Sequence, residues 1–188
     1  MKHVATFLII GLVFSSQAYS QQWITEWLPH LARPDSLVKM LTAEFQKAIG
    51  TKAPTFEYRR LNDSATHVFS EDSGNVVIVN LWATDCSGCR YEMPDLSRLQ
   101  DSYQVRGLRV IFLSSESAEK LNKFFEIHKI AGVKGIIDRN QLERPYQLIV
   151  KPSSFIVDRS GIVRETWIGP KAYEDLERSI QLYLGRDK

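Results

Sequence analysis

The sequence of 188 residues has few cysteines, no marked excess of charge of either sign, and no repeat or low-complexity tract. Its two cysteines are too few for the disulfide-stapled scaffolds of small secreted domains. The formal net charge is only +2 at pH 7 and no basic stripe occurs, which argues against nucleic acid as a partner. The 4 histidines are scattered, whereas a zinc site needs ligands at close spacing, so no metal is expected.

Long hydrophobic runs are also scarce, and the one that stands out lies near the N-terminus. Residues 4–14 are almost entirely apolar, but the run is shorter than the roughly 20 residues of a membrane-spanning helix. Lys2 precedes it, and small residues follow at Ala18 and Ser20, as before a signal-peptidase site. The pattern predicts a signal peptide over residues 1–20 and export to the periplasm or another extracytoplasmic space. An uncleaved membrane anchor is the alternative.

Residues 21–49 are predicted to form one or two amphipathic helices. Apolar side chains recur there every four positions, at Leu37, Leu41, Phe45 and Ile49. This helical N-terminal extension either packs on the domain that follows or docks a partner or a membrane surface.

The rest of the chain, residues 50–188, alternates strand and helix patterns and is predicted to be one domain. The expected elements are a hairpin over 55–69, a buried strand over 76–83, a helix over 87–103, a strand over 107–114, a helix over 115–128, a strand over 133–138, a hairpin over 153–168 and a helix over 172–184. Such an α/β order requires a central sheet with helices on both faces.

The two cysteines lie where the buried strand is followed by the helix, in the stretch Cys86-Ser87-Gly88-Cys89. At a helix N-terminus the unpaired N–H groups and the positive end of the helix dipole favour a thiolate, which is the species that attacks disulfides. A structural bridge over so short a loop would contribute only about 2 kcal/mol, and half a zinc site would lack its other ligands. A redox-active pair is therefore the favoured interpretation.

Three stretches carry a resemblance to a known family, namely residues 50–56, 79–94 and 151–161. Over about residues 50–186 the chain resembles the thioredoxin superfamily, and more narrowly the exported TlpA/ResA-type thiol–disulfide oxidoreductases. The resemblance implies a thioredoxin-like fold with a central mixed β-sheet flanked by helices and an N-terminal β-hairpin. It also implies that Pro152 is cis and faces the cysteine pair.

The resemblance implies a role for each residue of the site. Cys86 would attack a disulfide, Cys89 would resolve the mixed disulfide, and Glu92 would move protons and tune the thiols. A solvated position on the helix is the alternative for Glu92. The backbone of Lys151 and the ring of Pro152 would bind substrate.

Two further residues, Trp82 and Asp85, lie close to the cysteine pair in the sequence. Trp82 would wall the site, with a plain core position as its alternative. Asp85 stands where this family usually has an aromatic residue, and a carboxylate beside Cys86 disfavours the thiolate unless it points into water.

The resemblance implies an exported enzyme that reduces disulfides in other exported proteins, apocytochrome c being one candidate. It would act as a monomer without a cofactor, and a membrane electron donor would re-reduce it because its compartment is oxidising. A thiol oxidase or isomerase on the same fold and a non-catalytic binding module are the alternatives. A peroxidase of the peroxiredoxin branch needs a lone cysteine in a Pro-x-x-x-[Thr/Ser]-x-x-Cys setting, which this sequence lacks.

Overall fold

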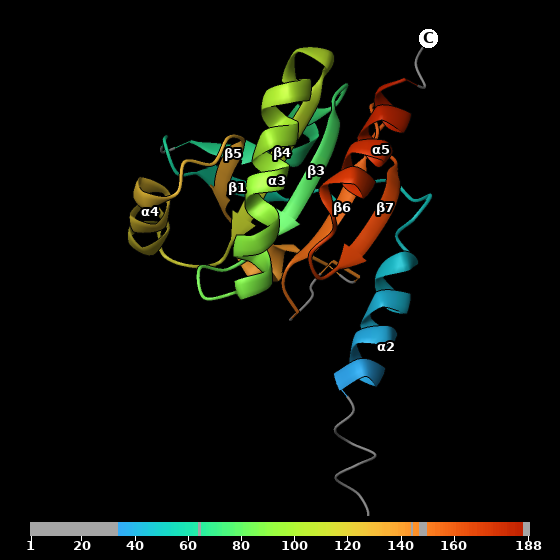
Figure 1. The fold of residues 1–188 in the computed structure, drawn as a ribbon, viewed down its shortest axis with the longest axis horizontal. Coiled ribbons are helices and arrows are strands. Elements are labelled where there is room, and N and C mark those ends of the chain that lie inside the picture. The colour runs from blue at the N-terminus through green and yellow to red at the C-terminus, as the bar shows by residue number, and fades with distance from the viewer. Residues whose placement is uncertain (1–33, 64, 144, 147–149, 186–188) are drawn as a thin grey trace, which may run out of the picture. The chain divides into compact units, whose positions relative to one another are not determined.

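The computed structural model describes residues 34–185 except 64, 144 and 147–149 (Figure 1). The predicted signal peptide and the first part of the predicted extension lie outside the described residues. The boundary expected at residue 50 therefore stays a prediction.

The helices and strands follow the order expected from the sequence. They are α2 (Pro34–Gln46), β1 (Glu57–Arg60), β2 (Thr66–Val68), β3 (Val76–Leu81), α3 (Ser87–Tyr103), β4 (Leu108–Ser114), α4 (Ala118–Ile127), β5 (Val133–Ile136), β6 (Ser153–Val157), β7 (Val163–Ile168) and α5 (Tyr173–Leu184). Short 3₁₀ turns occupy Phe69–Asp72, Gln104–Arg106 and Arg139–Gln141.

The strands form one mixed sheet in the order β2-β1-β5-β4-β3-β6-β7. The pairs β3–β4 and β4–β5 are parallel, whereas β6 runs antiparallel to β3 and to β7. The N-terminal hairpin of β1 and β2 extends the same sheet because β1 pairs antiparallel with β5. The predicted central mixed β-sheet flanked by helices is thus confirmed.

Strand β3 lies between β4 and β6, and every one of its residues is buried. The apolar run Val76–Val79 suits this position, since a strand covered on both faces needs no polar alternation. Asn80 is the polar exception in the strand and has no exposed surface. A buried side-chain amide needs hydrogen-bond partners, so polar groups are expected to lie opposite Asn80.

The sheet has a different cover on each face. Helices α3 and α5 lie along one face, where Met93, Leu96 and Ile180 pack with Ile78 of β3 (Figure 1). Leu121 of α4 joins the same cluster. Side chains of the other face, such as Val77 and Val79 of β3, belong to a second cluster.

The second cluster is built from the chain that precedes and connects the strands. It includes Phe45 near the end of α2 and Ala48 in the turn that follows, together with Phe56, Phe69 and Tyr146. Gly50 follows with a φ of 85°, in the left-handed region that ends a helix well. Phe45 and Ala48 of the predicted extension are therefore part of the core, whereas Ile49 is exposed.

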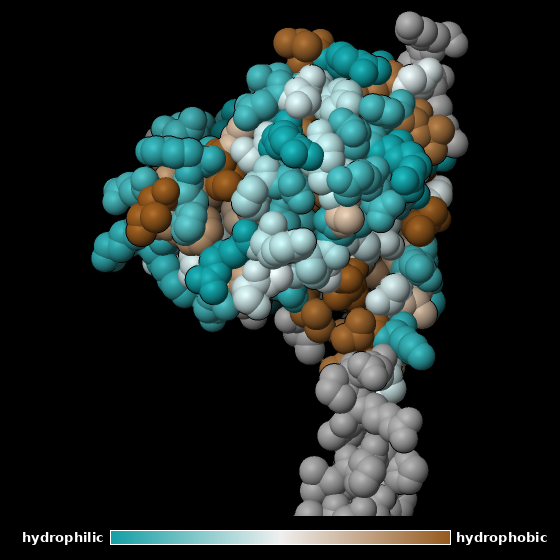
Figure 2. Space-filling view, viewed as in Figure 1, coloured by the Kyte–Doolittle hydropathy of each residue, from teal (hydrophilic) through white to brown (hydrophobic). Residues whose placement is uncertain are grey.

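The surface over α3 is mostly hydrophilic (Figure 2). Within the described part of the chain, no helix combines the length and the apolar character that crossing a bilayer requires.

Candidate active site

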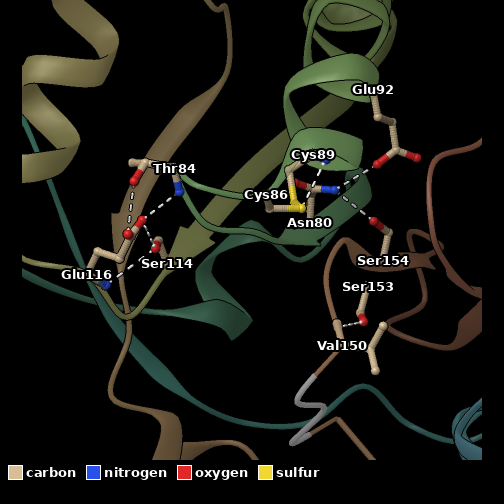
Figure 3. Close-up of a disulfide and its surroundings, with 10 residues drawn as sticks. All are labelled: Asn80, Thr84, Cys86, Cys89, Glu92, Ser114, Glu116, Val150, Ser153 and Ser154. Atoms are coloured by element: carbon tan, nitrogen blue, oxygen red, sulfur yellow. Dashed lines mark hydrogen bonds between the residues drawn. A yellow bond between two sulfur atoms is a disulfide. The ribbon is translucent and has the colours of Figure 1, made fainter. Parts of the chain in front are cut away.

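The two cysteines lie at the junction of β3 and α3, and they form a disulfide with a Cα–Cα distance of 5.3 Å (Figure 3). Cys86 is the N-cap residue of α3, and its Sγ accepts a hydrogen bond from the backbone N–H of Cys89 at 3.1 Å. Cys89 has no exposed surface, whereas Cys86 is partly exposed. The pair is therefore asymmetric, with one sulfur near solvent at the positive end of a helix and one sulfur in the core.

The loop that leads into Cys86 is anchored by a carboxylate from the next strand–helix connection. Glu116 accepts hydrogen bonds from the backbone N–H of Thr84 at 2.8 Å and from the Thr84 hydroxyl at 3.0 Å (Figure 3). Lys120 forms an ion pair with the same carboxylate and attracts the exposed Asp85 electrostatically. Asp85 is thus exposed to water and interacts at longer range with the positive charge of Lys120.

The peptide bond between Lys151 and Pro152 is cis, as the resemblance implied. Pro152 is adjacent to the cysteine motif, because a Cβ built on Gly88 would lie 3.3 Å from the Pro152 Cδ and 3.4 Å from the Pro170 Cδ. A side chain at position 88 would crowd Pro152, so the absence of one lets both prolines pack closely against the first turn of α3.

Glu92 lies on α3 one turn after Cys89 and has no exposed surface. The alternative of a solvated helix residue is therefore wrong. Its Oε1 accepts from the indole N–H of Trp167 at 2.9 Å and from the backbone N–H of Lys171 at 3.0 Å. Its Oε2 accepts from the side-chain amide of Asn80 at 3.1 Å, and that amide also donates to the Ser154 hydroxyl at 2.9 Å (Figure 3).

Burial raises the pKa of Glu92 to about 7, although the hydrogen bonds from Trp167, Lys171 and Asn80 favour the charged form and oppose the rise. Desolvation prevails because a carboxylate in the core has lost its water. A group with a pKa near neutrality exchanges a proton readily under ordinary conditions, which is what a general acid or base requires.

The remaining predicted site residues lie in different environments. Trp82 has no exposed surface and packs against the rings of Phe124 and Phe125, with centroid distances of 4.9 and 5.3 Å. This burial matches the core alternative, and substrate contact by Trp82 stays a prediction. Lys151 is partly exposed beside the cis bond, where its proposed backbone pairing with substrate is also a prediction.

The sequence reasoning missed the groups that hold Glu92 and the cysteine loop. Trp167 and Lys171 come from the C-terminal hairpin and the turn after it, far from Glu92 in the sequence. Glu116 reaches Thr84 across 32 positions. The one available signal was the lone polar Asn80 in an apolar strand, which required a polar partner opposite it.

Comparisons with known proteins agree with this geometry. A model of the AhpC/TSA family matches residues 49–166. The thioredoxin-like protein YneN of Bacillus subtilis is 27% identical over 135 residues, covering 71% of this chain and 79% of that protein. The thiol-disulfide oxidoreductase ResA of Bacillus anthracis is 30% identical over 130 residues, covering 69% of this chain and 75% of that protein.

Solved structures show the same architecture. A protein described as the thiol:disulfide interchange protein DsbE from Chlorobium tepidum is 27% identical with a TM-score of 0.67, over 73% of this chain and 98% of that chain. A thiol:disulfide interchange protein of the thioredoxin family from Chlorobium tepidum TLS is 24% identical with a TM-score of 0.63, over 72% and 97%. The second likeness concerns the fold alone, and the thioredoxin-like fold is confirmed.

Proposed function

The chain belongs to the AhpC/TSA family and is a thiol–disulfide oxidoreductase of the thioredoxin-like kind, and we propose that it reduces disulfides in other exported proteins. The observation that carries this proposal is the asymmetry of the cysteine pair. Cys86 is partly exposed at the start of α3, and Cys89 is buried one turn along, toward Glu92.

The chemistry follows from this arrangement. In the reduced enzyme the Cys86 thiolate attacks one sulfur of a substrate disulfide, forms a mixed disulfide and releases a substrate thiolate. The Cys89 thiolate then attacks the Cys86 sulfur and releases the second substrate thiol. Two electrons pass to the substrate, and the enzyme is left with the Cys86–Cys89 disulfide that the structure contains.

Glu92 is proposed to take up and return the proton of Cys89 during these steps. Its carboxylate lies on the same helix face three residues further on, and its pKa of about 7 suits both directions of transfer. Substrate would dock beside Pro152, with the Lys151 backbone pairing with an extended segment of the substrate. The position of Pro152 and Pro170 against Gly88 supports a docking surface at this point.

The setting is proposed from the sequence. Residues 1–20 would export the chain, which would work as a monomer in an oxidising compartment with a membrane electron donor to restore the dithiol. Apocytochrome c is one candidate among the exported substrates.

The reduction potential of the Cys86–Cys89 pair tests the proposed direction. We expect about −220 mV or lower, in the range of glutaredoxin and thioredoxin. A value between about −180 and −120 mV would instead indicate an oxidase or isomerase. A pair that exchanges with no disulfide would leave a binding module.

Trapping of mixed disulfides tests whether Cys86 attacks the substrate and Cys89 resolves the mixed disulfide. We expect Cys89→Ser to accumulate mixed disulfides with exported proteins, because the attack is intact and the resolution is lost. Cys86→Ser is the matched control and should trap none. Equal trapping by both variants, seen on non-reducing gels, would contradict the assignment of Cys86 as the attacking thiol.

A further inference from the structure

A row of polar side chains crosses the face of the sheet that α3 covers. Asn80 of β3 pairs in register with Ser154 of β6, and Ser154 pairs in register with Trp167 of β7. Residues directly opposite each other in neighbouring strands point to the same face. The row therefore runs under Glu92, within a face that is otherwise built from residues such as Ile78 and Ile156.

The hydrogen bonds that Glu92 accepts from the described residues all come from N–H groups. Trp167 and the Lys171 backbone donate to Oε1, and Asn80 donates to Oε2. An indole N–H is a donor only. Trp167 therefore stabilises the charged carboxylate of Glu92 but cannot accept a hydrogen bond from the O–H of the protonated acid. The Asn80 Oδ1 is a buried acceptor of the same side chain and has no partner among the described residues.

We propose that Trp167 is a positioning residue that holds the Glu92 carboxylate in place and sets the proton affinity of this group, and so the pH range in which the thiols react. The inference rests on the proposed role of Glu92 as the proton-transfer group. Hydrogen bonds to a charged carboxylate are about twice as strong as neutral ones, so the loss of this bond should favour the protonated acid.

The charge of Lys171, in the turn after β7, also favours the ionised form of Glu92, but it cannot substitute for the hydrogen bond from Trp167. The Lys171 amine pairs with Glu165 at 2.8 Å and lies 5.1 Å from the centre of the Trp167 ring. Glu165 in turn accepts from Tyr183 of α5 at 3.0 Å. The Lys171 charge is thus largely balanced by Glu165, whereas the Trp167 N–H points directly at the carboxylate.

The test is the titration of Glu92 in the full chain, followed by the ¹³C chemical shift of its carboxyl carbon. We expect Trp167→Phe to raise the midpoint by about one pH unit, a tenfold gain in proton affinity for one lost charge-assisted bond. Thr166→Val is the matched control. Thr166 is the neighbouring residue of the same strand, and its buried hydroxyl has no partner within the described part of the chain. Its removal should not move the midpoint.

A second variant separates the lost bond from altered packing. Replacement of Trp167 by β-(3-benzothienyl)alanine exchanges the N–H for sulfur at nearly the same shape, and it should give the same upward shift. An unchanged midpoint in both Trp167 variants would overturn the inference, as would an equal shift in Thr166→Val.

The pH profile of disulfide reduction distinguishes this inference from the proposed role of Glu92. If both hold, the profile moves upward in Trp167→Phe in step with the carboxyl titration, and Glu92→Gln loses that step of the profile. A carboxyl titration that shifts without any change in the profile would refute the role of Glu92. A profile that depends on Glu92 while neither quantity responds to Trp167 would refute the inference alone.

Discussion

Glu92 makes the stability of this protein depend on pH in a direction opposite to that of most carboxylates. Its side chain has no exposed surface, and burial raises its pKa from 4.5 to about 7. The folded protein therefore binds this proton more tightly than the unfolded chain does. We predict that Glu92→Gln removes the dependence, because an amide of the same shape does not ionise. The Asn80 Oδ1, for which the described residues offer no partner, can accept from the new amide once the Asn80 side chain turns.

The sign and size follow from proton linkage. Well below pH 4.5 the group is protonated in both states and carries no penalty. As the pH rises from there to about 7, the unfolded chain releases the proton first, so the free energy of unfolding falls. At about 1.36 kcal/mol per pH unit the full loss is roughly 3 kcal/mol, of which about 2.5 kcal/mol falls between pH 5 and pH 8.

Urea unfolding of the oxidised protein at several pH values measures this difference, since the bonded cysteines then do not titrate. Between pH 5 and pH 8 the parent should lose about 2.5 kcal/mol more than Glu92→Gln. A difference between the two proteins that is constant with pH would refute the raised pKa. A parent that gains stability relative to the variant would show that hydrogen bonding outweighs burial at this carboxylate.

Two further variants test the packing and the cysteine loop. Phe45→Ala should lower the free energy of unfolding in urea titrations by about 3–5 kcal/mol. The reason is that the Phe45 ring is fully buried and packs edge-on against Tyr146 and Phe155. A loss below about 1 kcal/mol would show that Phe45 is not part of the core. Burial opposes the charge of Glu116, but bonds from Lys120 and Thr84 prevail and lower its pKa. Glu116→Gln should therefore lower the free energy of unfolding by about 1–3 kcal/mol at pH 7. This loss should shrink in acid as Glu116 of the parent becomes protonated. A loss independent of pH would contradict the view that the charged Glu116 carboxylate holds the loop.

Much of the fold was predictable because its elements carry local signals. The helix expected over 87–103 is observed as Ser87–Tyr103, and the buried apolar run became the central strand β3. These predictions use only the spacing of apolar residues along the chain, which is a local property of each helix or strand. The pairing of β1 with β5, which adds the hairpin to the sheet, has no local signal because strand order depends on packing.

Part of the active site was likewise predictable from the sequence, and part was not. Cys86, Cys89 and Glu92 follow one another at helical spacing, so the sequence alone placed them on one side of α3, and the cis bond at Pro152 matched the expectation from resemblance. The burial of Trp82 was open in the sequence, since a tryptophan beside a site and a tryptophan in the core look alike.

Sequence by itself determined which chemistry this protein carries, because a cysteine pair at a helix start is a local arrangement of a few residues. Only the tertiary structure decided how that chemistry is tuned. The row of Asn80, Ser154 and Trp167 arises from the register of three strands, and it meets Glu92 because α3 packs on that face. The proton affinity of a buried carboxylate depends on the burial and the donors around it, and these exist only once distant segments are packed together.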